Sequence, residues 1–336
     1  MSDFKYIMLN NYVYVDKTRY IEMLEREANP SQFFIRPRKF GKNLFFTTLL
    51  YYYNMNEVEN FDALFGNLYI GKHPTPKRNS YAVMYFDFSG VGIGNEETFR
   101  NSFSNKVKVT VKQFLERYKS VLEGADRLLR QIKEESHGIS VLENVFLLAH
   151  DKLNIFVIID EYDQFANDLI ANSAIPEEGV YKTMMTANGL VRDFYEQVKI
   201  ATKTSTVSRT FITGISPVMI DDMTSGYNIA TNYTLKSRYN EMLSFTREEV
   251  EWMMNETGVD PALNLKQFIS YISENAFCRL SDHDLQRFDE KYIKILLLAY
   301  LFMDKTYVSM SEYETVPGRA DIFLQRNPIN PYAHYE

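Results

Sequence analysis

The sequence is poor in the residues that stabilise small domains through disulfides or structural zinc. Its one cysteine is Cys278, which excludes an internal disulfide. The five histidines are scattered, and no group of cysteines and histidines has the spacing of a zinc site. The fold must therefore be held by a hydrophobic core. A lone thiol suits a reducing compartment, so we expect a cytoplasmic protein.

Long apolar runs and targeting patterns are also missing. The first residues, MSDFKYIML, lack the pattern of a signal peptide. The longest apolar run, near Ile293–Met303, is too short to span a bilayer, so we expect no membrane partner. The net charge of −7 repels nucleic acid, so DNA binding would need a local basic patch.

Motifs of two other enzyme classes are not supported either. The Gly-x-Ser-x-Gly elbow of serine hydrolases is absent. Gly90, Gly92 and Gly94 follow a strand candidate, but the third glycine comes one residue too early for a dinucleotide-binding loop. We interpret this segment as a flexible loop.

The residues that are present predict a globular α/β protein. With 336 residues, 45% of them apolar and 24% charged, the chain has the composition of about two soluble domains. Aromatic residues reach 15%, and we expect phenylalanines in the core and tyrosines on the surface. Strands are expected at Tyr12–Val15, Gln32–Arg36, Ala82–Phe88, Ile155–Ile159 and Arg209–Thr213. Helices are expected at Arg19–Glu27, Gly41–Tyr53, Glu96–Tyr118, Val121–Glu135 and Val141–His150. This alternation favours a parallel sheet covered on both faces.

The stretch Phe33–Asn43 (FFIRPRKFGKN) is an apolar run that ends in cations and a Gly-Lys pair. A phosphate-binding loop reads Gly-x4-Gly-Lys-Ser/Thr, in which backbone amides wrap the phosphates and the hydroxyl binds Mg²⁺. Gly41 and Lys42 occupy the second glycine and the lysine positions. Arg36 stands at the first glycine position and Asn43 at the hydroxyl position. The plainer alternative is a basic turn between a strand and a helix.

The stretch Asn154–Asp163 (NIFVIIDEYD) places two carboxylates after a buried strand. Ligands bind at the carboxyl ends of such strands. There Asp160 would hold Mg²⁺ through water, and Glu161 would orient or deprotonate an attacking water. Thr213, at the end of the next strand candidate, would place a polar sensor near the γ-phosphate. The alternative is a strand that simply ends in surface acids.

The order of the strands adds to this hypothesis. One strand lies between the lysine loop and the acidic strand, and another strand follows the acidic one. This is the chain order of the additional-strand class of P-loop ATPases, in which a glutamate directly follows the magnesium aspartate.

Five short motifs together resemble bacterial AAA-ATPase-like proteins that carry a PD-(D/E)XK nuclease domain after the ATPase. These motifs are Tyr14-Val15-Asp16-Lys17-Thr18, Arg36-Pro37-Arg38-Lys39-Phe40-Gly41-Lys42, Asp87-Phe88-Ser89, Ile159-Asp160-Glu161-Tyr162-Asp163 and Phe211-Ile212-Thr213-Gly214-Ile215-Ser216. The resemblance covers roughly residues 3–260 and resumes at 264–336. It implies a P-loop domain over residues 1–242, a helical lid or linker over 243–263, and a partial nuclease domain over 264–336.

The resemblance also implies roles for individual residues. Lys42 would bind phosphate, Asp160 would hold Mg²⁺ and Glu161 would be the catalytic base. Arg36 and Arg38 would replace glycine amides as phosphate donors, because guanidinium binds phosphate with two hydrogen bonds. Asn43 departs from the family's usual serine. Its amide oxygen would still face Mg²⁺, but more weakly than a hydroxyl, and this affects hydrolysis more than binding. In the lid, Thr246 and Glu249 have the spacing of a capping box at the start of a helix.

Residues 264–336 resemble the beginning of the nuclease, an α+β restriction-endonuclease-like domain. Glu290 matches the catalytic position on its helix, and Asp321 matches the catalytic and metal-binding position on its strand. We expect helices at Gln267–Ala276 and Asp289–Met303, then a strand pair, Tyr307–Glu314 and Ala320–Leu324. If the chain ends at Glu336, we expect no cleavage, because the family's Glu-x-Lys strand would begin there. The alternative is a small α+β domain with ordinary surface acids.

Two main functions remain open at this point. The first is an ATPase, with ATP and Mg²⁺ as ligands, coupled to a metal-dependent nuclease that acts on DNA. The second is a nucleotide-gated interaction module with little or no hydrolysis and no nuclease activity. A scaffold with a vestigial nucleotide site is a third reading. Whether the chain forms an oligomer is left open.

Overall fold

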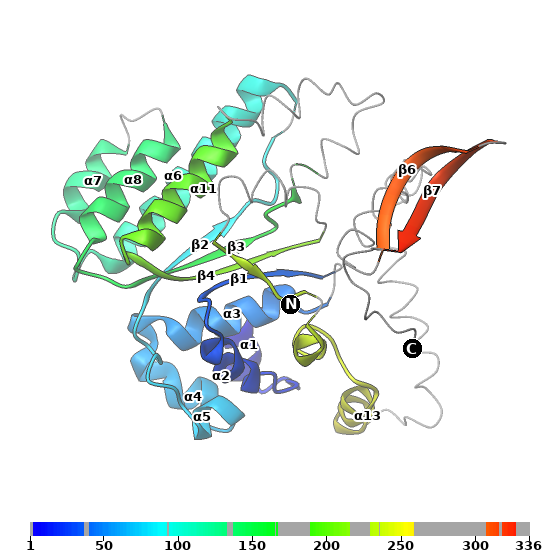
Figure 1. The fold of residues 1–336 in the computed structure, drawn as a ribbon. Helices are drawn as coiled ribbons and strands as arrows, with labels where there is room; N and C mark the ends of the chain where they lie inside the picture. Colours follow the sequence, from blue (N-terminus) through cyan, green and yellow to red (C-terminus); the bar gives the residue numbers. More distant parts are fainter. Residues whose placement is uncertain are drawn as a thin grey trace.

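The computed structural model of the chain shows a parallel sheet between two layers of helices (Figure 1). It describes residues 3–36, 40–92, 94–132, 137–164, 166, 189–215, 229–234, 236–258, 307–315 and 318–326. The predicted α/β class is confirmed for this part of the chain. In the described ranges no helix is both long and apolar enough to cross a membrane.

Five parallel strands form the sheet, in the order β2-β3-β4-β1-β5. They are β1 (Ser31–Ile35), β2 (Ala82–Asp87), β3 (Ile155–Asp160), β4 (Val207–Gly214) and β5 (Thr231–Asn232). The four longer strands match the predicted ones within two residues, and β5 was not predicted. Strand β4 lies between β1 and β3 although it follows both in the chain. Ile35 pairs with Gly214, and Asp87 pairs with Asp160, so the strands end together at one edge.

Within the described residues, one face of the sheet is covered by helices of the middle part of the chain (Figure 1). These are α6 (Glu96–Tyr118), α7 (Ala125–Gln131), α8 (Gly138–Ala149) and α11 (Leu190–Lys203). Helix α6 has the predicted bounds because its sequence carries both a capping residue and apolar residues at helical spacing. The Asn95 side chain caps it by accepting from the Thr98 backbone N–H. Phe99, Phe103 and Val107, four residues apart, face the core. Helix α7 is shorter than predicted, since the left-handed Gly124 (φ 94°) precedes it.

The other face carries the N-terminal helices (Figure 1). These are α1 (Phe4–Leu9), α2 (Arg19–Arg26), α3 (Lys42–Tyr53), α4 (Phe61–Phe65) and α5 (Tyr69–Lys72), with the 3₁₀ helix η1 (Met55–Asn60). The predicted strand Tyr12–Val15 is wrong, because this segment runs between α1 and α2 without pairing to any described strand.

The expectation that tyrosines lie on the surface is also wrong for this part of the chain. The largest fully buried side chains include Tyr52, Tyr53, Tyr118, Tyr162, Tyr195, Tyr233 and Tyr239. Burial of a phenol is tolerated where its hydroxyl finds a partner. The Tyr118 hydroxyl, for example, donates to Asn54 Oδ1 (2.9 Å) and accepts from the Val83 N–H (2.8 Å).

In the described part of the chain, the sheet is followed by the 3₁₀ helix η2 (Ser237–Tyr239), a longer helix and a hairpin. Helix α13 (Arg247–Glu256) begins at the predicted capping box, formed by Thr246 and Glu249. The predicted strand pair is confirmed as the antiparallel hairpin of β6 (Tyr307–Thr315) and β7 (Gly318–Arg326). Asp321 belongs to β7. Glu290 and the two helices predicted before the hairpin lie outside the described residues.

Candidate functional site

The lysine loop connects β1 to α3 at the edge where the strands end. Gly41 adopts a left-handed conformation (φ 78°) directly before the helix, which favours glycine because a side chain would be strained there. Lys42 is the first helical residue and only 5% exposed. Its Nζ donates to the Arg36 carbonyl oxygen at 2.8 Å. Asn43 follows on the exposed side of the first helical turn. Arg38 lies outside the described residues.

The acidic turn follows β3 at the same edge. Asp160 ends the strand and is 1% exposed. Glu161 has a left-handed backbone (φ 49°), uncommon for a residue with a side chain, and its N–H donates to Asp160 Oδ1 at 3.0 Å. This sharp turn leaves Glu161 half-buried beside the strand end. Strain of this kind is often found at functional sites.

The turn is fixed against the end of β4. The Tyr162 N–H donates to the Thr213 carbonyl at 3.2 Å, and the buried Asp163 carboxylate accepts from the Ile215 N–H at 3.1 and 3.2 Å. Gly214 is required here, since a Cβ atom would lie 2.3 Å from the Tyr162 ring. The acidic turn and the end of β4 therefore form one packed unit.

Strand alternation places the key side chains on one face of the sheet. Phe156 and Ile158 of β3 belong to the core under α3, so Asp160, two residues further, points to that face. Phe211 of β4 belongs to the same core, so Thr213 points there too. The Thr213 side chain is fully buried, and its Oγ1 has no hydrogen-bond partner in the described part of the chain. An unpartnered buried hydroxyl is costly and calls for an explanation.

The pKa of Asp160 shows which charged side chains lie around it. Burial raises the pKa of the Asp160 carboxyl to about 7, and the negative charges of Glu161 and Asp87 add to the rise. The Lys42 ammonium opposes it by favouring the charged carboxylate. The charges of Lys42, Glu161 and Asp87 thus all reach the Asp160 carboxyl, which places these side chains together at one edge of the sheet.

Arg36 has a different environment from Lys42. Its guanidinium donates to the carbonyl oxygens of Ile35 (2.9 Å) and Thr234 (2.7 Å). These bonds tie the end of β1 to the segment that leads to α13. The phosphate-binding role expected of Arg36 stays a prediction.

A pocket that the sequence did not reveal adjoins the lysine loop. Its volume is about 490 Å³, the open space at its mouth included. Three segments line it, represented by Val13, Val15 and Lys17 before α2, Phe40, Gly41 and Leu44 around the start of α3, and Met242, Phe245 and Met253 around α13. Its wall is mainly apolar, and Gly41 belongs both to the wall and to the lysine loop. No short motif marks the pocket, because its segments are far apart in the chain.

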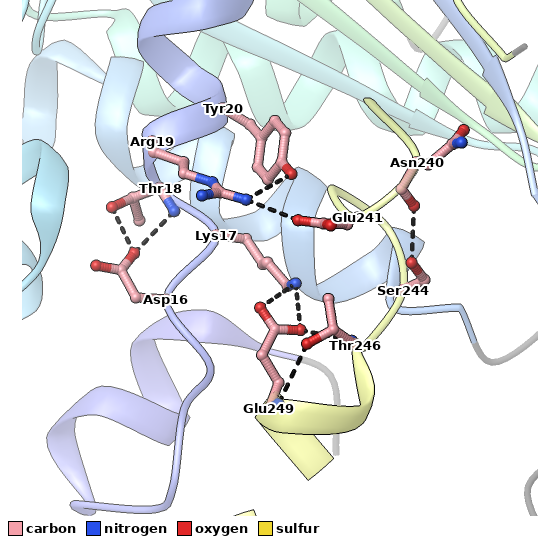
Figure 2. A network of polar contacts seen from close by, with 10 residues as sticks. All are labelled: Asp16, Lys17, Thr18, Arg19, Tyr20, Asn240, Glu241, Ser244, Thr246 and Glu249. Atoms are coloured by element: carbon pink, nitrogen blue, oxygen red, sulfur yellow. Dashed lines mark hydrogen bonds and ion pairs between the residues drawn. The ribbon is translucent and has the colours of Figure 1, made fainter. Parts of the chain in front are cut away.

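One side of this pocket is held by polar contacts (Figure 2). Asp16 accepts from the N–H and hydroxyl of Thr18 and, through its other oxygen, from the Tyr69 N–H of α5 (2.7 Å). Lys17, between them, points the other way, and its Nζ donates to both carboxylate oxygens of Glu249 at 2.5 and 2.6 Å. This ion pair joins the segment before α2 to helix α13.

The oxygen atoms at this edge suit a cation such as Mg²⁺ that takes few protein ligands. Within the described ranges no group of three or more His, Cys, Asp and Glu side chains could hold a metal ion. Asp160 supplies one buried carboxylate that interacts with Lys42, and Asn43, the residue after Lys42, carries an amide oxygen on an exposed side chain. Mg²⁺ in nucleotide sites commonly takes one or two protein oxygens and completes its shell with water and phosphate. These residues fit such an ion.

Comparisons with known proteins are consistent with this geometry. A family model described as "Predicted AAA-ATPase" matches residues 1–224. A curated relative from Azotobacter chroococcum mcd 1, described as "Uncharacterized protein in vnfD 5'region", is 24% identical over 253 residues. The match covers 72% of this chain and 41% of the relative, so the chain spans about two fifths of that protein's length. No solved structure matches the chain.

Proposed function

We propose, because this chain belongs to the predicted AAA-ATPase family, that the sheet edge between Lys42 and Asp160 binds the triphosphate of ATP together with Mg²⁺. One observation carries the proposal. A buried lysine at the start of α3 and a buried aspartate with a raised pKa at the end of β3 act on each other across the end of β4. The inserted β4 is the arrangement expected of the additional-strand class.

Each residue of this edge has a task in the proposal. Lys42 exchanges the Arg36 carbonyl for phosphate oxygens, and the start of α3, the positive end of the helix dipole, favours the phosphate charge. Asp160 and Asn43 hold the Mg²⁺, which neutralises phosphate charge when bound. The unpartnered Thr213 hydroxyl donates to the terminal phosphate. Glu161 orients a water and takes its proton.

The apolar pocket supplies the place for the base. Gly41 and Leu44 link it directly to the phosphate-binding lysine, so one ligand can occupy both. A flat aromatic base gains by leaving water for a wall of Val15, Phe245 and Met253. We therefore assign the pocket to the adenine of ATP.

Isothermal titration of the protein with ATP and Mg²⁺ tests the proposal. Wild type should bind, and Lys42→Ala should bind about 10- to 100-fold more weakly, since it loses charge-assisted hydrogen bonds to phosphate. Lys119→Ala is the matched control, because Lys119 is an exposed lysine on the other side of the sheet (side chain 55% exposed). Absence of binding by wild type, or equal binding by Lys42→Ala, contradicts the proposal.

A nucleotide-gated module without turnover is the second candidate. The observation that favours it is Asn43, which stands where the family's hydroxyl would bind Mg²⁺. Tight ATP binding with negligible release of phosphate supports this candidate. Turnover that Glu161→Gln abolishes supports the ATPase.

The division of the chain into residues 1–242, 243–263 and 264–336 stays a prediction, and so does the nuclease activity. The family match ends at residue 224, before the nuclease region begins. Asp321 lies on a strand, as predicted, and Glu290 lies outside the described residues. Metal-dependent cleavage of DNA therefore stays a prediction. Incubation of the chain with duplex DNA and Mg²⁺ tests it.

A further inference from the structure

Helix α13 forms one wall of the pocket but is not part of either large core. Its buried residues Val250 and Met254 form a small apolar cluster with Met253, separate from the cores on the two faces of the sheet. Among the described residues, its firmest attachment to the N-terminal segment is the ion pair of Lys17 with Glu249. The position of this wall therefore depends on a polar contact.

We propose that Lys17 and Glu249 are positioning residues that hold α13 against the base, so that this ion pair sets the affinity for the base but not for the triphosphate. The inference rests on the proposed function of the pocket. On this proposal, α13 affects nucleotide affinity separately from the phosphate-binding residues. Two residues that lie 232 positions apart control its position.

The Lys17 side of the contact is held in place by bonds that do not involve α13. The residues on both sides of it are bonded to the start of α5, where Asp16 accepts from the Tyr69 N–H and the Thr18 hydroxyl accepts from the Ile70 N–H. Lys17 itself is 6% exposed. Its Nζ also lies 5.9 Å from the centre of the Phe245 ring, another part of the pocket wall. Lys17 is thus a cation held in a fixed position that faces α13.

The Glu249 side of the contact links the ion pair to the start of the helix. Besides both bonds from Lys17, Glu249 Oε2 accepts from the Thr246 N–H at 2.8 Å, and the Glu249 N–H donates to Thr246 Oγ1 at 3.2 Å (Figure 2). One carboxylate therefore caps α13 and attaches it. Removal of the Glu249 charge leaves the buried Lys17 ammonium unpaired, and removal of the Lys17 charge leaves the half-buried Glu249 carboxylate unpaired. Either loss is unfavourable enough to move the helix.

A neighbouring ion pair provides an internal control. Arg19, the first residue of α2, and Glu241, which precedes α13, form an ion pair at 2.8 Å, but their side chains are 52% and 51% exposed. Exposed pairs of this kind contribute little to stability. Neither residue lines the pocket, so Glu241→Gln should leave nucleotide binding unchanged.

The experiment compares ATP with inorganic tripolyphosphate, both with Mg²⁺, on the full chain. Lys17→Met keeps the length of the side chain without its charge, and Glu249→Gln keeps the capping box. We expect each single variant to bind ATP about tenfold more weakly and to bind tripolyphosphate within about twofold of wild type. The double variant, which leaves no unpaired charge, should recover part of the ATP affinity.

The position of the helix can be followed independently. Trp252 is the one tryptophan of the chain, lies on α13 and is 43% exposed. Quenching of its fluorescence by acrylamide should change in both single variants and stay as in wild type for Glu241→Gln. A thermal melt followed by circular dichroism confirms that each variant is folded.

Each outcome has one meaning. If wild type binds ATP and both single variants bind it equally well, the positioning role is overturned while the nucleotide site stands. If the variants lose ATP and tripolyphosphate in parallel, the ion pair supports the whole site and the inference is also wrong. If wild type binds neither ligand, the proposed function fails and the inference fails with it.

Discussion

The two ends of the proposed nucleotide site are built in different ways. The phosphate end consists of buried polar side chains at the ends of β1, β3 and β4, in the middle of a sheet. The base end consists of an irregular segment before α2 and a helix outside the two main cores. A sheet edge can hold reacting groups at fixed distances, whereas a helix held by one ion pair can shift. We therefore expect changes at the phosphate end to affect chemistry and stability, and changes at the base end to tune affinity.

The largest expected effect lies at the phosphate end. Glu161→Gln removes the proposed base and should lower the rate of phosphate release by about 10²- to 10⁴-fold, with ATP affinity nearly unchanged. A coupled phosphate assay measures the rate, and titration calorimetry measures the affinity. Glu123→Gln, on an exposed turn, is the control. A variant that keeps full turnover would show that Glu161 is not the base.

The next effect concerns stability and its dependence on pH. Because the folded protein holds the Asp160 proton up to a pKa of about 7, whereas a free aspartate loses it near 3.8, the folded state binds more protons between these values. The contribution of Asp160 to the free energy of unfolding therefore falls as pH rises from about 4 to 7 and is level above that range.

Asp160→Asn removes this pH-dependent cost. The variant should gain stability over wild type, by roughly 3 kcal/mol more at pH 8 than at pH 5. Urea unfolding without Mg²⁺ at both pH values measures the difference. An equal difference at the two pH values would mean that the aspartate is not held with a raised pKa.

A smaller effect tests how rigid the phosphate end is. A Cβ atom on Gly214 would lie 2.3 Å from the Tyr162 ring and 2.5 Å from Asp163 Oδ1. Gly214→Ala should therefore lower the free energy of unfolding by about 2 kcal/mol and slow turnover, because the acidic turn must shift. Gly94→Ala is the control, since nothing lies within 4 Å of a Cβ atom there. Unchanged stability of Gly214→Ala would indicate a deformable turn.

The smallest effect lies at the base end. Met253→Ala removes part of the half-buried pocket wall and should weaken ATP binding roughly fivefold, while tripolyphosphate binding stays the same. Competition with a fluorescent ATP analogue measures both. Loss of tripolyphosphate binding in this variant would mean that the two ends are not separate.

The same contrast explains what the sequence could predict. The strands β1 to β4, α6, and the convergence of Lys42 with Asp160 and Glu161 followed from short contiguous patterns. Apolar runs that end in charged residues are visible without a structure, and the carboxyl ends of parallel strands must meet at one edge. The sharp conformation of Glu161 and the partner of the acidic turn on β4 depend on packing and were not predicted.

The base end was missed for a physical reason. Tyr12–Val15 has the β-branched and aromatic residues of a strand, yet its apolar side chains serve as a pocket wall. Lys17 finds its partner 232 residues further along the chain, at a distance where local patterns carry no information. The capping box at Thr246 predicted where α13 begins but not what its glutamate would hold.

A crystal structure with a non-hydrolysable ATP analogue and Mg²⁺ tests the central claim most directly, because the claim is that one ligand spans both ends. We predict that Lys42 Nζ leaves the Arg36 carbonyl, 2.8 Å away in the free protein, for the phosphate oxygens, with the base between Val15 and Met253. A structure in which Lys42 keeps the Arg36 carbonyl while the nucleotide is bound elsewhere would contradict the account.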